Sequence, residues 1–598
     1  MFVFEIRVRI VKTLLIAGFL LSTVNAMAEA VPVELLRTED GWQLLRDGKP
    51  YLIKGAGGEY SLPKLAAAGA NSVRTWDAEG IDELLDEAHS LGLTVTVGIW
   101  LGHERHGFDY NDKNQVAEQM ERARRLVTRY KDHPAVLLWG IGNEMEGFDS
   151  GDNPAVWKAV NDIAAMVKQL DPNHPTMSVT SEIGGGRIDS LHKQSPAIDI
   201  HGINSYGGAL SLADRLRAGG GSKPFVLTEF GTPGPWEAQE TEWGAPFEPT
   251  STDKAEFYAK ACKNAVTDAP GLSLGSYAFV WGFKMESTAT WFGMFLSDGS
   301  SLGAVDVMSE FWTGSPPENF APVVTPLTMD QPTMLEPGDT VFVKASISDP
   351  EGGDIRTRWL LRPESTEYST GGDFRPDLPE VEGAVIEASA EGATVRLPTD
   401  PGPYRLFLYA YDDSGRAATA NIPLLVKGEV GTRFPVTVYE DGLDHMPWAP
   451  TGWMGVSRSL TMDGNHRDNP QSGAASIKLR YGQRSGWVGV AWQNPPGNWG
   501  DQDGGYDLTG ATALELWARG EKGGERIGFG VGLIGGNKPY PDSAIEKVDG
   551  VVLTREWQRY IVPLENADLS KVSTGFVVTL TGRKKPITVY LDSIRFIR

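Results

Sequence analysis

Cysteine is almost absent from this chain. Cys262 is the only one among 598 residues, so no intrachain disulfide can form. It lies four residues after Tyr258 and four before Val266, within a helix-period pattern. That spacing predicts a buried core position rather than a reactive thiol. The fold must therefore be held together by packing.

Positive charge is also scarce. The chain has 55 Lys and Arg against 78 Asp and Glu, a formal net charge of −23 at pH 7. A surface this acidic repels nucleic acid and anionic membranes, so neither is an expected partner. A neutral substrate fits this charge better than an anionic one, unless a local basic patch overrides it.

Long apolar runs are missing as well. Leu14 to Val24 is an apolar run of eleven residues, too short for an ordinary membrane span. It follows three basic residues and precedes Ala26-Met27-Ala28, a small-residue cleavage pattern. Residues 1–28 are therefore predicted to be a secretory signal, with an uncleaved anchor as the alternative. Cleavage would leave a secreted or periplasmic protein without a membrane segment and, having lost three basic residues and one acidic, with a charge of −25.

What the sequence does have is a long alternation of short apolar runs and helix-period segments, from residue 30 to 312. Ile81, Leu84, Leu85 and Ala88, for example, follow the i, i+3, i+4, i+7 spacing of a helix face. Eight strands, mostly followed by helices, predict a (β/α)₈ TIM barrel. The expected strands are 51–57, 72–77, 94–101, 136–144, 177–182, 199–206, 225–231 and 274–282. A doubly wound open sheet is the alternative, but residues 55–58 lack its G-x-G-x-x-G phosphate loop.

The helical pattern stops after the barrel. Residues 313–323 read as a proline-rich linker that few contacts should cross. Residues 324–427 show short alternating strands and turn clusters, which predict an immunoglobulin-like β-sandwich. Residues 433–598 remain β-rich but gain tryptophan, and predict a second, larger sandwich of jelly-roll type.

Two glutamates stand at the ends of predicted barrel strands, Glu144 on the fourth and Glu229 on the seventh. Catalytic groups of this fold lie at the carboxyl ends of the strands. Two carboxylates that face one another across the barrel mouth are what acid–base cleavage of a glycosidic bond requires. The alternative is a pair of unrelated surface glutamates.

Five short segments, in this order, carry a family resemblance: 54–59 (KGAGGE), 71–76 (NSVRTW), 133–144 (HPAV leading to GNE), 204–207 (NSYG) and 228–231 (TEFG). Together they resemble clan A glycoside hydrolases, especially the barrel domain of family 2, with family 5 as a near neighbour. The resemblance covers residues 38–312, about half of the chain. The sandwich domains that normally precede a family 2 barrel are not found before it.

The resemblance implies a role for each matching residue. Glu144 would be the general acid/base and Glu229 the nucleophile, with carboxyl groups about 5–5.5 Å apart and retention of configuration. The substrate-binding residues would be Asn143 on the sugar 2-hydroxyl, Arg74 and Tyr206 on the nucleophile, and Trp281, at the end of the eighth strand, stacked on a pyranose face.

Other residues are less certain. Trp100 and Trp291 are candidate lining residues, and Trp139 is expected in the barrel core. His103 to His106 suggest a metal site, but no third ligand is apparent, so a substrate loop is preferred and no catalytic metal is expected. Glu182 ends the fifth strand as a spare carboxylate.

The C-terminal sandwich resembles carbohydrate-binding modules. Its candidate sugar-binding residues are Trp448, Trp453, Trp487, Trp492, Trp499 and Tyr540, although most are expected to be core. Asp501, Asp503 and Asp507 form an acidic loop that is a weak candidate for structural calcium.

The sequence thus predicts a secreted retaining β-glycosidase that acts on a neutral poly- or oligosaccharide without an organic cofactor. A β-glucan, such as a β-1,3-linked polymer, is the first expectation, with β-mannan and β-galactan open. The alternatives are a transglycosylase that uses the same two glutamates and a non-catalytic glycan-binding protein. The oligomeric state is not predicted.

Overall fold

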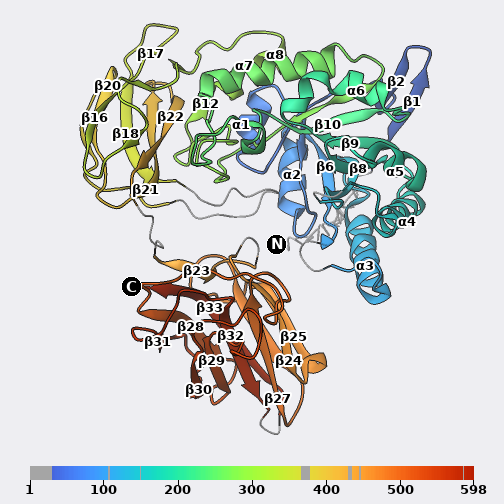
Figure 1. Ribbon diagram of the computed structural model, residues 1–598. Helices are drawn as coiled ribbons and strands as arrows, with labels where there is room; N and C mark the ends of the chain where they lie inside the picture. The colour runs from blue at the N-terminus through green and yellow to red at the C-terminus, as the bar shows by residue number, and fades with distance from the viewer. Residues whose placement is uncertain are drawn as a thin grey trace, which may run out of the picture.

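The computed structural model describes residues 30–104, 108–147, 150–364, 378–428, 434–443, 446–582 and 585–598. The predicted signal at 1–28 and His106 lie outside these residues. The predicted fold class, a TIM barrel followed by two all-β sandwiches, is confirmed (Figure 1). In the described part of the chain, no helix is long and apolar enough to cross a membrane.

Eight parallel strands close the barrel in the order β10-β11-β4-β5-β6-β7-β8-β9. They are β4 (Ile53–Gly57), β5 (Ser72–Arg74), β6 (Thr94–Ile99), β7 (Val136–Asn143), β8 (Thr176–Ser181), β9 (Ile200–Asn204), β10 (Phe225–Phe230) and β11 (Ser273–Ala278). The expected strands correspond one to one, but the eighth ends four residues earlier than predicted. Both faces of each strand are covered, which explains why these segments are continuously apolar rather than alternating.

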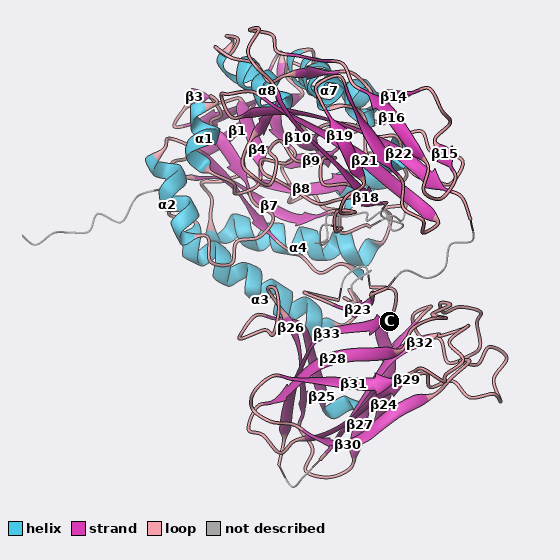
Figure 2. Ribbon diagram, turned by 90° about the vertical axis from the view of Figure 1, so that its left-hand side faces the viewer, coloured by secondary structure: helices cyan, strands magenta, loops and turns pink. Residues whose placement is uncertain are grey.

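Helices surround the barrel (Figure 2). They are α1 (Leu62–Ala67), α2 (Asp82–Ser90), α3 (Lys113–Tyr130), α4 (Pro154–Leu170), α5 (Arg187–Gln194), α6 (Leu212–Ala218), α7 (Ser251–Cys262) and α8 (Gly303–Thr313), with short turns η2 (Gly207–Ser211), η3 (Pro235–Glu237) and η4 (Lys263–Thr267). Helix starts follow local chemistry: the Asn153 side chain accepts a hydrogen bond from the Ala155 amide (3.0 Å), and Pro154 opens α4. Cys262 is fully buried, as predicted.

A hairpin closes the end of the barrel opposite the strand-end glutamates. It consists of β1 (Val33–Thr38), β2 (Gly41–Arg46) and β3 (Lys49–Pro50). The Val33 amide donates to the Asn173 carbonyl (2.8 Å) and the Trp42 amide to the Gly271 carbonyl (2.7 Å). Both acceptors lie in loops that lead into strands, so the hairpin covers the amino-terminal end, opposite the end where catalytic groups of this fold lie.

The middle sandwich has two main sheets. One contains β18 (Arg356–Pro363), β21 (Gly402–Tyr411), β22 (Arg416–Val426), β12 (Ser301–Leu302) and β15 (Met334–Leu335); the other contains β14 (Thr328–Met329), β16 (Thr340–Lys344), β20 (Gly392–Arg396) and β19 (Val385–Ala388). A short pair, β13 (Val323–Val324) and β17 (Ile347–Ser348), completes it. Side chains of both sheets form its core, and the exposed–buried alternation of Thr340–Lys344 accounts for the predicted pattern.

The expectation that few contacts would cross residues 313–323 is wrong. The β12 strand, which precedes α8, pairs with β22 of the middle sandwich. The Arg405 guanidinium, on β21, donates to the Pro246 carbonyl of the barrel domain (2.8 Å) and is 1% exposed. An apolar cluster also combines Leu296 and Leu302 with Phe407 and Tyr409. The barrel and the middle sandwich are therefore one packed body.

The C-terminal sandwich has its own core of apolar side chains from both of its sheets. Its strands are β23 (Val436–Tyr439), β24 (Ala449–Gly455), β25 (Leu460–His466), β26 (Ser476–Tyr481), β27 (Trp487–Gln493), β28 (Ala513–Gly520), β29 (Arg526–Val531), β30 (Glu546–Val552), β31 (Gln558–Pro563), β32 (Thr574–Thr581) and β33 (Ile587–Ile597), with turn η5 (Ser457–Ser459). They form sheets ordered β25-β26-β33-β28-β31, to which β23 adds, and β24-β27-β32-β29-β30.

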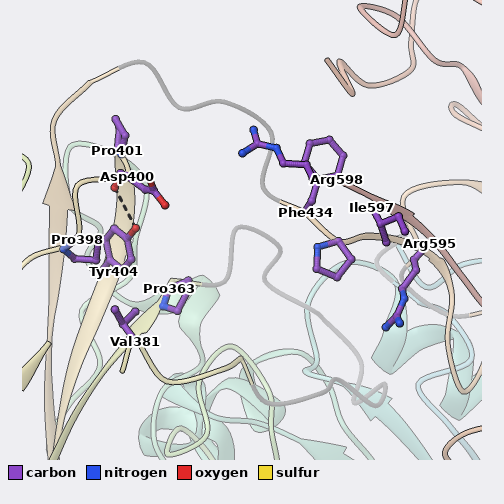
Figure 3. Close-up of a pocket in the computed structure, with 11 residues that line it drawn as sticks. Pro363, Val381, Pro398, Asp400, Pro401, Tyr404, Phe434, Arg595, Ile597 and Arg598 are labelled. Atoms are coloured by element: carbon purple, nitrogen blue, oxygen red, sulfur yellow. Dashed lines mark hydrogen bonds between the residues drawn. The ribbon is translucent and has the colours of Figure 1, made fainter. Parts of the chain in front are cut away.

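A cavity of about 780 Å³ separates the two sandwiches (Figure 3). Pro398, Pro401 and Tyr404 line one side of it, and Phe434 and Arg598 line the other. It lies away from Glu144 and Glu229, which are not among its lining residues. It is a gap between two domains, lined by residues of both sandwiches.

Candidate active site

Glu144 and Glu229 both stand at the carboxyl end of the barrel. Glu144 follows the last residue of β7, and its backbone has a φ of 52°, in the left-handed region that non-glycine residues rarely adopt. The register between β7 and β8 shifts between Gly140 and Asn143. This irregularity turns the chain at the strand end, where a side chain can be re-aimed. Glu229 lies within β10 and is 6% exposed.

Three donors surround the carboxylate of Glu229. Arg74 Nη1 lies 2.9 Å and Trp76 Nε1 2.8 Å from its Oε1, and the Tyr206 hydroxyl donates to Oε2 at 3.0 Å. Donors of this kind fix the orientation of the carboxylate. Burial and the nearby charge of Glu229 raise the pKa of the Tyr206 hydroxyl well above its usual value, so Tyr206 stays a donor. This geometry suits an anionic nucleophile.

The surroundings of Glu144 disfavour the charged form of its carboxyl group. Burial, followed by repulsion from Glu229, raises the pKa of the Glu144 carboxyl to about 8, although Asn204 donates a hydrogen bond to its Oε1 (2.6 Å). Glu144 therefore holds its proton at neutral pH, as a general acid must. A carboxyl group with a raised pKa beside a second carboxylate held by donors is the arrangement that acid–base catalysis uses.

Asn143 links the two carboxyl groups. Its Oδ1 accepts hydrogen bonds from Arg74 Nη2 (2.7 Å) and Asn204 Nδ2 (3.2 Å). Thr228 Oγ1 in turn donates to Asn204 Oδ1 (2.8 Å). With its oxygen held by two donors, the amide of Asn143 keeps its NH₂ group as a donor, which fits the expected contact with a sugar hydroxyl.

An aromatic wall lies beside Glu229. It consists of Trp76, Tyr206, Phe279, Trp291 and Phe292. The Phe279 ring contacts the rings of Trp76 and Tyr206 edge-on, each with centroids 5.9 Å apart. Gly57 makes room for Trp76, because a Cβ there would lie 3.0 Å from its indole. The wall gives the anionic centre an apolar side, as sugar-binding sites require.

Trp281, expected to stack on the sugar, lies elsewhere. It is 1% exposed, and its ring packs against Phe295 and Trp312, at centroid distances of 4.8 and 6.1 Å. An indole this covered offers no face to a substrate. The difference arises because β11 ends at Ala278, so Phe279 rather than Trp281 stands next to Tyr206.

The remaining candidates are placed as follows. Trp100 stacks on His103 (4.9 Å, 9° between planes), Trp291 is buried in the wall, and Trp139 is core, where its Nε1 donates to Asp171 (2.7 Å). Glu182 is paired with Arg215 (2.7 Å). No group of three or more residues in the described part of the chain is arranged to hold a metal ion.

The weak calcium candidate in the C-terminal sandwich is not supported. Asp501 pairs with Lys538 and Asp503 with Lys571, and Asp507 accepts a hydrogen bond from the Thr509 amide (2.9 Å). Carboxylates already neutralised by lysines are poor ligands for a hard cation.

Trp76 and Asn204 donate hydrogen bonds to Glu229 and Glu144, and sequence reasoning did not assign them, although both lie in the segments that carry the resemblance. Asn204 ends β9 and Trp76 follows β5 by two residues. Their position at strand ends was the available signal.

Comparison with known proteins finds a family match within the barrel. The family model "Glycosyl hydrolases family 2, TIM barrel domain" matches residues 69–233, a stretch that includes Arg74, Glu144 and Glu229. Over this stretch the barrel is similar to the family 2 glycoside hydrolase barrel, in agreement with the resemblance that the sequence motifs indicated.

Among curated proteins, the chain is 28% identical to a β-glucuronidase of Bacteroides fragilis over 134 residues, 18% of each chain. It is 28% identical to the β-glucuronidase of Sus scrofa over 187 residues, 27% of this chain and 26% of that one. A probable mannan endo-1,4-β-mannosidase C of Aspergillus terreus is 28% identical over 131 residues, 18% of this chain and 32% of that one. The chain thus spans less than a third of the length of these relatives.

Solved structures give a distant match. A β-D-glucuronidase of Dictyoglomus thermophilum is 20% identical with a TM-score of 0.37, over 48% of this chain and 54% of that one. An endo-β-1,4-mannanase of Thermotoga petrophila is 16% identical with a TM-score of 0.33, over 64% and 99% of the two chains.

Proposed function

We propose that this protein is a retaining β-glycosidase that hydrolyses a neutral β-glycan. The observation that carries the proposal is the contrast in surroundings between two glutamates at the same end of the barrel. Three donors hold Glu229, whereas the pKa of Glu144 is raised to about 8 by burial and by Glu229. A double-displacement mechanism needs one anion and one acid in this arrangement.

The proposed reaction has two balanced steps. Glu229 attacks the anomeric carbon while Glu144 gives its proton to the departing glycosidic oxygen, which forms a covalent glycosyl-enzyme and frees the leaving sugar. Glu144, now ionised, takes a proton from water, and the resulting hydroxyl displaces Glu229 from the anomeric carbon. The released Glu229 carboxylate then regains the hydrogen bonds from Arg74, Trp76 and Tyr206.

The partners of the nearby cations support a neutral substrate. Arg74 is bound to Glu229 and Asn143. Lys284 pairs with Glu286 (3.5 Å) and lies over the Phe279 ring (5.7 Å to the centroid). A uronate carboxylate would compete with these partners. β-Glucan, including β-1,3-linked polymers, is our first candidate, with β-mannan and β-galactan next.

We also propose that the protein is exported and that its C-terminal sandwich binds glycan. The pattern of residues 1–28 supports export. The aromatic residues Trp453, Trp487, Trp499 and Tyr540 are between 37% and 47% exposed, which supports sugar binding, whereas Trp448 and Trp492 are fully buried core residues. N-terminal sequencing of the mature protein and pull-down of residues 434–598 on insoluble glycans test the two ideas.

The central experiment is a reducing-end assay on a panel of β-glucans, β-mannans, β-galactans and glucuronides, with product sizes resolved. Glu229→Ala should abolish turnover, and azide should restore cleavage with an inverted glycosyl azide, because a small anion fits the vacated space. Wild-type activity in Glu229→Ala would refute the assignment. Longer products would identify a transglycosylase, and a lack of turnover on every glycan would favour a binding protein.

A further inference from the structure

We propose that Trp236 forms a second sugar-binding subsite beside the catalytic one, so that the enzyme binds a chain of at least two sugar units. Trp236 lies on η3, in the loop that follows β10. It is 50% exposed, the largest exposed fraction recorded for a large apolar side chain in the described part of the protein. The inference rests on the proposed function, since it concerns the same substrate.

The position of the indole connects it to the nucleophile. Its ring meets the Tyr206 ring edge-on, with centroids 5.6 Å apart, and the Tyr206 hydroxyl donates to Glu229. It also lies against Phe292 of the aromatic wall, at 6.1 Å. One tyrosine ring thus separates the exposed indole from the reacting carboxylate, so a sugar on Trp236 would neighbour the sugar that reacts.

The loop holds the indole rigidly. The Glu237 carboxylate accepts hydrogen bonds from the Gly234 and Gly207 amides, both 2.9 Å, and so ties the loop after β10 to the loop after β9. The indole covers Gly234 so closely that a Cβ there would lie 2.4 Å from the ring. A preorganised aromatic surface loses little entropy when a ligand binds.

The chemistry of the surface specifies the ligand. A flat apolar ring, half open to water, suits the C–H face of a pyranose, while the sugar hydroxyls remain hydrated. The nearby cations are engaged by carboxylates: Lys284 pairs with Glu286 and Arg74 with Glu229. The subsite is therefore expected to take a neutral hexose unit.

The test compares Trp236→Ala and Trp236→Phe with wild type on two kinds of substrate. One is a β-glycosyl fluoride of a single sugar, whose one-atom leaving group leaves the neighbouring subsite empty. The other is a series of β-1,3-linked glucose oligosaccharides of two to six units, with β-1,4-linked mannose oligosaccharides in parallel. Trp236→Ala should lower kcat/KM about tenfold or more on oligosaccharides and by less than about twofold on the glycosyl fluoride. Trp236→Phe should recover most of the loss.

Phe342→Ala, which removes a 45% exposed aromatic ring from β16 of the middle sandwich, is the matched control and should leave both rates unchanged. An equal fall on both substrates would show that Trp236 only supports Tyr206, and no fall on either would show that it binds no sugar; each result overturns the proposal. Calorimetry in the Glu229→Gln background separates this proposal from the proposed function. Tenfold weaker oligosaccharide binding by Trp236→Ala/Glu229→Gln would support the subsite even if the wild-type enzyme cleaved nothing.

Discussion

Two buried clusters of charge in this protein differ in how their carboxylates are compensated. At the barrel mouth, burial and the neighbouring Glu229 leave Glu144 with a raised pKa of about 8. At the boundary with the middle sandwich, burial also acts to raise the pKa of Glu248, but Lys254 and Arg405 outweigh it and the pKa is lowered. The raised pKa of Glu144 fits the proposed proton transfer, whereas the compensated charges around Glu248 hold the barrel and the middle sandwich together.

The boundary cluster has a partner for each of its groups. Glu248 accepts hydrogen bonds from Thr288 (2.6 Å), Thr290 (2.8 Å) and, across the boundary, Asn421 (2.7 Å). Arg405 reaches Asn421 (2.7 Å) and Glu364 (2.8 Å). Because Thr290 directly precedes the wall residues Trp291 and Phe292, the middle sandwich helps to hold the loop that lines the active site.

The largest expected effect comes from removal of the middle sandwich. A chain that ends at residue 318 keeps Lys254 and Glu248 but loses Asn421 and Arg405, and it exposes Leu296 and Leu302. It should be insoluble or lack a cooperative melting transition, measured by circular dichroism. A chain that ends at Gly428 loses only the C-terminal sandwich, which has its own core. It should melt and cleave soluble oligosaccharides like the full protein; a stable, active 318-residue chain would contradict the comparison.

Isosteric variants of one carboxylate from each cluster sharpen the contrast. Glu229→Gln should lose about 10⁴-fold or more in kcat/KM, because the nucleophile is gone. Its stability should fall by only about 1–2 kcal/mol, since Arg74 keeps acceptors on Thr228 and Asn143. Glu248→Gln should show the reverse order: a marked loss of stability with a smaller loss of kcat in the folded fraction. Urea titration and initial rates on one substrate distinguish the two outcomes.

The sequence was sufficient to predict the barrel and the position of both glutamates at its carboxyl end. Continuous apolar runs between helix-period segments specify buried parallel strands, and a strand end specifies where a catalytic side chain can stand. It was insufficient for Trp281, because a four-residue error in the end of β11 exchanges a core position for a site position.

Other features have no local signal. Glu248 and Arg405 belong to different domains, and a proline-rich segment between them suggested separation rather than contact. The sequence also does not show which tryptophans of the C-terminal sandwich are buried. Trp492 is fully buried, whereas Trp487, on the same strand, is 47% exposed. Only the position on the strand, not the composition, separates core from surface.

A smaller effect is expected from a single cation. Arg405→Met should destabilise the protein by about 3–5 kcal/mol, because it leaves the buried Glu364 without its charge partner. The matched control is Arg129→Met, which breaks an exposed pair with Asp82 and should cost at most about 1 kcal/mol. Both values come from urea unfolding at pH 7. Equal effects of the two substitutions would mean that the boundary cluster contributes no more than a surface ion pair.

The smallest expected effect is the gradual change of kcat/KM and of stability with pH. Glu144 must be protonated to act as the acid, so kcat/KM should fall about tenfold per pH unit above a pKa of about 8. Stability should change in the same direction: the raised pKa means that the folded state binds the proton more tightly than the unfolded chain. The contribution of Glu144 to stability is therefore fully present below pH 4.5 and is lost as pH rises toward about 8.

Glu144→Gln should remove both trends and spare substrates with activated leaving groups, which need no proton. The control Glu248→Gln should retain the basic limb, since Glu248 belongs to the boundary cluster; a basic limb that survives in Glu144→Gln would assign the acid to another residue.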